Sequence, residues 1–169
     1  SDMDCFKEFL FREVTAYTEP SIGVSDPSLS DKNWWNELKH TPSFKPEYWS
    51  RYYDYLLKKP SWSITAVENI NSSTDEIMNS LTNPRKGMAG ERMGMVFGYV
   101  QSGKTAHYIG MINKAYDAGY RIVIVLSGIH NSLRSQTQSR IDEEVLGYET
   151  SLESIGDMTR ERNAIGVGI

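Results

Sequence analysis

The chain has 169 residues, of which 39% are apolar and 24% are charged, a composition typical of a folded globular protein and not of a disordered one. Lys and Arg number 18 against 22 Asp and Glu, and the net charge of −4 excludes a broad basic surface for nucleic acid. No apolar run approaches the ~20 residues of a membrane span, and the single Cys5 excludes an internal disulfide, so we expect a cytoplasmic protein with no membrane association.

Four helices are predicted within residues 1–88, which we interpret as a helical N-terminal region. The first has an apolar face at three- and four-residue spacing, formed by Phe6, Leu10, Val14 and Tyr17. The second is short and carries Trp34 and Trp35. The third begins near Pro46 and ends at Pro60, and its apolar stripe consists of Trp49, Tyr52 and Leu56.

The fourth helix is predicted from a capping box, in which a serine and a glutamate three residues apart satisfy the first amides of a helix. Ser73 and Glu76 have this spacing, and Pro84 is expected to end the helix. All four tryptophans precede residue 63. Two interpretations of them remain open, namely core packing and stacking against a nucleotide base.

Residues 89–169 have a different pattern, which predicts alternating strands and helices. The apolar run at 93–97 and the β-branched run at 122–126 are typical of buried strands. Each is followed by a helical pattern, and Gly119 and Gly147 are expected to end the two helices. The order strand, helix, strand, helix predicts an α/β fold with a parallel sheet.

The strongest motif lies between the first predicted strand and its helix. Residues 98–105 match the phosphate-binding loop G-x-x-x-x-G-K-[ST] at every fixed position. In such a loop, glycines let backbone amides face a triphosphate, the lysine binds the β- and γ-phosphates, and the hydroxyl of the last residue binds Mg²⁺. We therefore predict ATP and Mg²⁺ as cofactors, with Lys104 and Thr105 as the residues that serve catalysis and Thr105 as the metal ligand. The predicted nucleotide-binding residues are Gly98, Gln101, Ser102, Gly103, Lys104, Thr105 and Ala106.

ATP hydrolysis also needs an acidic residue that holds the metal, at the end of a later strand. The acidic run 142–144 follows polar residues and not an apolar strand, so we interpret it as a solvated helix face. We expect the metal-binding acid to lie after residue 169 in a longer protein, of which this chain is an N-terminal fragment. The fragment alone is then expected to be inactive.

Three stretches of this half resemble the Z1 domain family, endonucleases of bacterial restriction and repair loci with a superfamily 2 helicase-type ATPase core. They are residues 98–105, 114–120 and 124–138, and the preceding stretches 48–56, 62–63 and 75–77 also fit the family's helical lead-in, so that the resemblance covers roughly residues 45–147. The resemblance implies a partial RecA-like, three-layer P-loop NTPase domain at 89–169. It also implies that Asn131, Arg134 and Gln136 contact the backbone of DNA.

By this resemblance, the full-length bacterial protein is a helicase-like ATPase or endonuclease, a hydrolase that acts on DNA in restriction-modification or repair, with partner proteins of those systems. Two alternatives remain open. One is a nucleotide-responsive module that binds a protein partner and has no nuclease activity. The other is a small nucleotide kinase, although the chain offers little room for a lid and a second substrate pocket.

Overall fold

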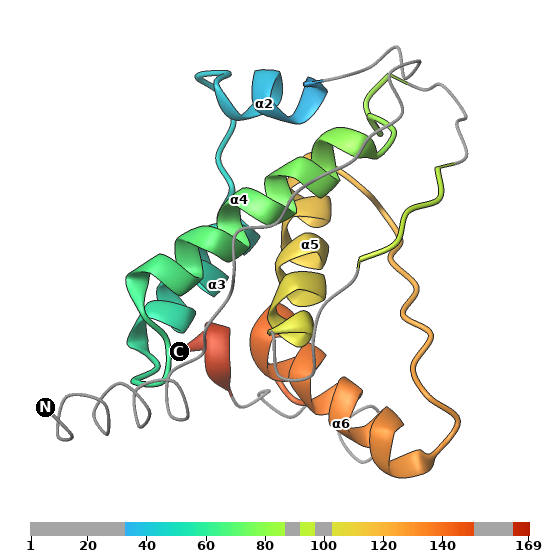
Figure 1. Cartoon of the computed structure of the whole chain (residues 1–169). Coiled ribbons are helices and arrows are strands. Elements are labelled where there is room, and N and C mark those ends of the chain that lie inside the picture. The colour runs from blue at the N-terminus through green and yellow to red at the C-terminus, as the bar shows by residue number, and fades with distance from the viewer. Residues whose placement is uncertain (1–32, 87–91, 97–102, 151–163) are drawn as a thin grey trace, which may run out of the picture.

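The computed structural model describes residues 33–86, 92–96, 103–150 and 164–169. It shows a body of packed helices (Figure 1). In chain order these are α2 (Trp34–Lys39), α3 (Glu47–Lys58), α4 (Ile64–Ser80), α5 (Lys104–Ala118) and α6 (Asn131–Ile141), followed by the π-helical turn η1 (Asp142–Leu146) and the 3-10 turn η2 (Gly166–Gly168). The first predicted helix, over residues 6–17, lies outside the described residues.

Local sequence signals explain where α3 begins and how it is buried. Pro46 directly precedes the helix, and the predicted stripe of Trp49, Tyr52 and Leu56 is its buried face. Both predictions are confirmed. The first amides of α3 are capped from another helix, because Asp117 near the end of α5 accepts hydrogen bonds from the amides of Tyr48 (3.0 Å) and Trp49 (2.8 Å).

The predicted start of the fourth helix at Ser73 is wrong. α4 begins ten residues earlier, where the Ser63 hydroxyl accepts a hydrogen bond from the amide of Ala66 at 3.1 Å. Ser73 lies within the helix, and its hydroxyl donates to the carbonyl of Ile70 at 3.1 Å. The cap at Ser63 and the buried residues of the first turns allow one continuous helix. The capping-box spacing of Ser73 and Glu76 therefore falls inside this helix and marks no helix start.

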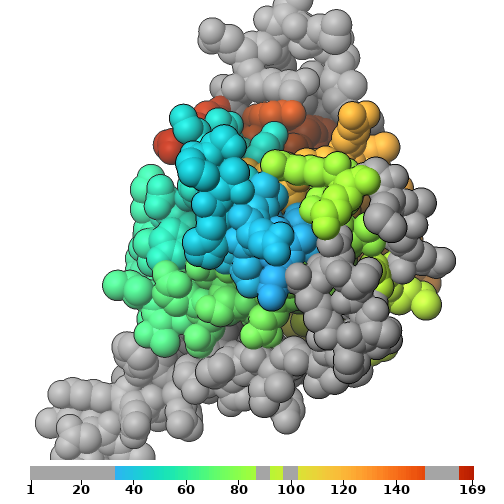
Figure 2. Space-filling model, turned by 90° about the horizontal axis from the view of Figure 1, so that it is seen from above, coloured from blue at the N-terminus to red at the C-terminus, as the bar shows by residue number. Residues whose placement is uncertain are grey.

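Two apolar clusters hold the helices together. The larger joins α3, α4, α5 and both short turns through Trp49, Tyr52, Leu56, Val67, Ile70, Ala106, Ile109, Ile112, Val145 and Val167. The smaller joins α2 to α4 and α5 through Trp34, Trp35, Met78 and Ala118. Figure 2 shows the surface of α2 and the chain after it lying over α4. The predicted boundary near residue 88 stays a prediction, although helices from both sides of it share the larger cluster.

Gly110 explains how closely α5 approaches the helices before it. A Cβ atom there would lie 3.1 Å from the Trp49 ring and 3.4 Å from the Thr74 methyl group. The missing side chain therefore lets α5 lie against both α3 and α4.

The predicted parallel sheet is wrong for the part of the chain that the structure describes. Residues 92–96 and 121–128 form neither helix nor strand, and the bridge whose two residues are both described joins Tyr148 and Ala164. Ile122, Ile124 and Leu126 are 77%, 78% and 91% exposed. A strand needs a neighbour that accepts and donates its backbone hydrogen bonds, and no described segment provides one here. The α/β, RecA-like fold class is therefore corrected to a helical body with extended segments.

The two later helices end as predicted. Gly119 and Gly147 follow α5 and η1 with φ of 102° and 82°, the left-handed conformation that glycine adopts without strain. Among the described helices, none combines the length and apolar character that crossing a membrane requires.

Candidate phosphate-binding cleft

A cleft of about 410 Å³ lies beside the start of α5. Four parts of the chain line it: one face of α3, the α3–α4 turn, the first turn of α5, and the α6–η1 segment. The lining side chains that carry charge or a large aromatic ring are Lys59, Trp62, Lys104, Arg140, Glu144 and Tyr52. Its volume is within the range of small-molecule sites.

The start of α5 supplies polar groups at one side of the cleft. Gly103 precedes the helix with φ 75° and has no side chain that could cap it. The first amides of any α-helix lack a partner within the helix and carry a partial positive charge, which favours an anion there. The Lys104 side chain is exposed, and the hydroxyl of Thr105 shares a hydrogen bond with that of Tyr108.

On the side of the cleft opposite the start of α5, the buried carboxylate of Glu144 holds two cationic side chains in place. The side chain of Glu144 is 2% exposed, and it accepts hydrogen bonds from Lys59 Nζ at 3.0 Å and from Arg140 Nη1. Partial burial opposes the charge of Arg140, but Glu144 outweighs it and raises the pKa of the guanidinium. Burial, together with Glu144, also raises the pKa of the Tyr52 hydroxyl.

The cleft is positively charged although the chain as a whole is acidic. Its lining includes three cationic side chains, Lys59, Lys104 and Arg140, and one anionic side chain, Glu144, whereas the chain has a net charge of −4. A concave site with a local excess of positive charge attracts anionic ligands. The chemistry that the cleft supports is therefore the binding of a phosphate-bearing molecule.

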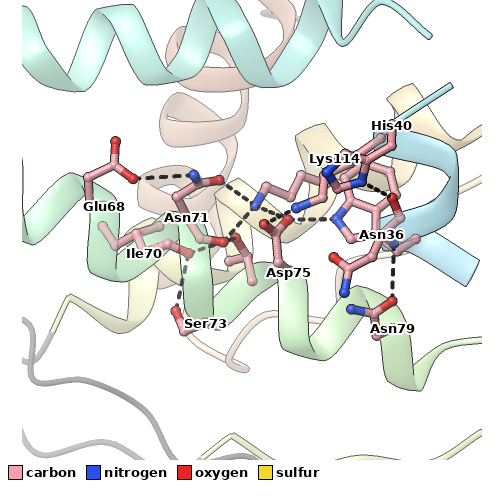
Figure 3. A network of polar contacts seen from close by, with 12 residues as sticks. Asn36, His40, Glu68, Ile70, Asn71, Ser73, Asp75, Asn79 and Lys114 are labelled. Carbon is pink, nitrogen blue, oxygen red and sulfur yellow. Dashed lines mark hydrogen bonds and ion pairs between the residues drawn. The ribbon is translucent and has the colours of Figure 1, made fainter. Parts of the chain in front are cut away.

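A second charged cluster has no such opening (Figure 3). Lys114 of α5 has a side chain that is 1% exposed, and its ammonium group donates to Asp75 Oδ1 (2.7 Å), to the Asn71 carbonyl (2.8 Å) and to Asn71 Oδ1 (2.9 Å). It also lies 4.1 Å from the centre of the Trp49 ring. Burial lowers the pKa of Lys114 from 10.5 to about 8, against the opposing effect of Asp75.

Asp75 binds two further donors, which tie α2 into this cluster. Lys39 Nζ and Trp35 Nε1 each lie 2.6 Å from one of its oxygens. Burial alone would raise the pKa of Asp75, but Lys114, Lys39 and Trp35 together lower it below 3.8. All of the ammonium hydrogens of Lys114 therefore have acceptors within the protein, and we assign this cluster a structural role.

The structure places four of the predicted nucleotide-binding residues together. Gly103, Lys104, Thr105 and Ala106 all line the cleft. The predicted residues Gly98, Gln101 and Ser102 lie outside the described residues. The predicted DNA-contacting residues Asn131, Arg134 and Gln136 are exposed on α6 and do not line the cleft.

Sequence reasoning missed the rest of the cleft. The acidic run 142–144 was predicted to be solvated, but Asp142 and Glu144 are 4% and 1% exposed. Asp142 is buried because it accepts hydrogen bonds from the amide of Thr150 at 2.9 Å and from Gln138 at 2.8 Å. The four-residue spacing of Arg140 and Glu144 was the one local signal of their ion pair. Lys59 and Trp62 follow no motif.

Comparison with known proteins adds no further assignment. No family model matches the chain, and neither a curated protein nor a solved structure matches it. The resemblance to the Z1 domain family stays a prediction. Within the described ranges, no group of three or more His, Cys, Asp or Glu residues is placed to hold a metal ion.

Proposed function

We propose that this chain binds a nucleoside triphosphate, as its Mg²⁺ complex, in the cleft beside the start of α5. One observation carries the proposal: the Lys-Thr pair that ends the G-x-x-x-x-G-K-T motif lines a cleft that also contains Lys59 and Arg140. The motif and the surrounding charge are independent features, and both favour the same ligand chemistry.

The cationic side chains and the Thr105 hydroxyl at the cleft then have definite roles. The Lys104 ammonium binds the terminal phosphates, and the first amides of α5 bind phosphate oxygens through their partial positive charge. The hydroxyl of Thr105 is a suitable Mg²⁺ ligand, since Mg²⁺ in nucleotide sites is held by few protein oxygens together with phosphate oxygens and water. The metal offsets part of the phosphate charge. Lys59 and Arg140 add positive charge from the other walls.

For the identity of the nucleotide and the role of the whole protein, the proposal relies on the resemblance of the sequence to the Z1 domain family. On that basis the nucleotide is ATP, and the chain is the ATP-binding N-terminal part of a helicase-like ATPase or endonuclease that acts on DNA in restriction-modification or repair. The exposure of Asn131, Arg134 and Gln136 on α6 supports this part of the proposal, because exposed side chains remain accessible to a DNA backbone.

Titration calorimetry with Mg-ATP tests the binding proposal. We expect Lys104→Ala to weaken binding by about 10- to 100-fold, the effect of losing a hydrogen bond from a charged group. Lys45→Ala is the matched control, because Lys45 is an exposed lysine that does not line the cleft. Equal affinity of wild type and Lys104→Ala, or no binding by wild type, would overturn the proposal.

A further inference from the structure

The cleft has an apolar lining beside its cations. Trp62, Leu56 and Tyr52 all contribute to it. The other three tryptophans of the chain are committed to the interior: Trp34, Trp35 and Trp49 are 2%, 1% and 9% exposed. Trp62 is half-buried, and it packs against the larger apolar cluster without being one of its buried members. It is therefore the tryptophan with ring surface available to a ligand in this cleft.

The backbone around Trp62 is held by the helices on both sides. Its amide donates to the carbonyl of Lys59 at 3.0 Å, one residue beyond the last residue of α3. The next residue, Ser63, caps α4. A ring on such a short, anchored turn loses little freedom when a ligand binds, which favours its use as a contact surface.

We propose that Trp62 binds the base of the nucleotide whose phosphates lie at Lys104, so that the cleft selects a nucleoside triphosphate over an inorganic polyphosphate. This step rests on the proposed function. Lys59, Lys104 and Arg140 account for the binding of phosphate, and they do not account for the part of Trp62 that core packing leaves exposed at the cleft. A nucleotide has both an anionic chain and a flat aromatic base, and it accounts for both kinds of lining.

Paired titrations with Mg-ATP and Mg-tripolyphosphate separate the two kinds of contact. We expect Trp62→Leu to weaken ATP binding by about tenfold, the typical effect of removing one base-stacking ring, and to leave tripolyphosphate binding unchanged. Trp62→Phe keeps an aromatic ring and should restore most of the ATP affinity. Tyr48→Leu is the matched control, since Tyr48 is an exposed aromatic residue of α3 that does not line the cleft.

Tryptophan fluorescence of the unaltered protein provides a second test, which does not depend on the folding of a variant. We expect saturating Mg-ATP to change the emission and Mg-tripolyphosphate to leave it nearly unchanged. If Trp62→Leu binds ATP as tightly as wild type, or both ligands change the emission equally, Trp62 does not bind the base. If wild type binds neither ligand, the proposed function itself fails, and the two failures are thus distinguishable.

Discussion

Asp75 and Glu144 are each held by two cations, but their surroundings differ in a way that separates structure from function. Asp75 is bound by Lys39 and Lys114, whose side chains are 31% and 1% exposed, and neither of them lines the cleft. Glu144 is bound by Lys59 and Arg140, whose side chains are 28% and 44% exposed. Both of the cations at Glu144 line the cleft.

The difference shows what each cluster can do. Lys114 cannot exchange its partners for water or a ligand, because its acceptors come from within the helical body and the ammonium is enclosed. Lys59 and Arg140 line the cleft and remain partly exposed, so a ligand can approach them there. Breaking either cluster leaves a buried carboxylate or ammonium short of a partner and is costly, but only the cations at Glu144 both line the cleft, where a ligand can reach them.

The largest expected effect comes from removing the carboxylate of Asp75 from its ion pair with the buried Lys114. Asp75→Asn leaves the buried ammonium of Lys114 without its carboxylate, and we expect the free energy of unfolding to fall by about 3–5 kcal/mol. Lys114→Met should cost clearly less, because Asp75 keeps Lys39 and Trp35 as partners. Urea unfolding monitored by circular dichroism measures both values.

Glu76→Gln is the control for this pair of variants, since Glu76 is the exposed neighbour of Asp75 on the same helix and should change stability by less than about 0.5 kcal/mol. A loss at Asp75→Asn no larger than this would contradict the role assigned to the cluster. Nucleotide affinity of Lys114→Met should equal that of wild type, because neither Lys114 nor Asp75 lines the cleft.

A smaller effect is expected from the pKa of Lys114. Its pKa is about 8 in the folded protein and its ordinary value is 10.5, so between these values the unfolded chain holds more protons than the folded one. The free energy of unfolding should therefore rise with pH in this window, by at most about 1.4 kcal/mol per pH unit. Well below pH 8 Lys114 is protonated in both states, and it should make no contribution to the pH dependence of stability.

The measurement is the difference in unfolding free energy between wild type and Lys114→Met at pH values from 7 to 10. The tyrosines titrate in both proteins, so their contribution to the free energy of unfolding largely cancels in the difference. A difference that stays flat or falls across this range would mean that the ammonium of Lys114 is not desolvated in the folded protein.

The sequence predicted α3 and the ends of the two later helices because their signals are local, whereas the predicted start of α4 was wrong. Pro46, Gly119 and Gly147 act within one turn of the helix ends that they define. The clusters are different, since Lys114 meets Asp75 across 39 residues and Glu144 meets Lys59 across 85. No spacing rule links such positions, and only the packing of α3, α4 and α5 brings them together.

The motif at 98–105 identified the half of the cleft that α5 supplies, because a phosphate-binding loop is itself a local pattern. It gave no information on Trp62 or Arg140. The two predicted strands failed for the opposite reason. A β-branched run favours an extended backbone, and residues 121–128 are indeed outside any helix, but burial and pairing depend on a partner segment.

The smallest expected effect tests this correction directly. Ile124 is 78% exposed whereas Ile70 is 0% exposed within the larger apolar cluster. Ile124→Thr should change the free energy of unfolding by less than about 0.5 kcal/mol, and Ile70→Thr should lower it by more than about 2 kcal/mol, because only Ile70 loses buried apolar contacts and gains a buried hydroxyl. Urea unfolding of both variants provides the comparison. Losses of similar size would show that Ile124 is buried as the sequence pattern predicted. A negligible loss at Ile124 would show that removal of a side chain from water, and not its β propensity, decides its contribution here.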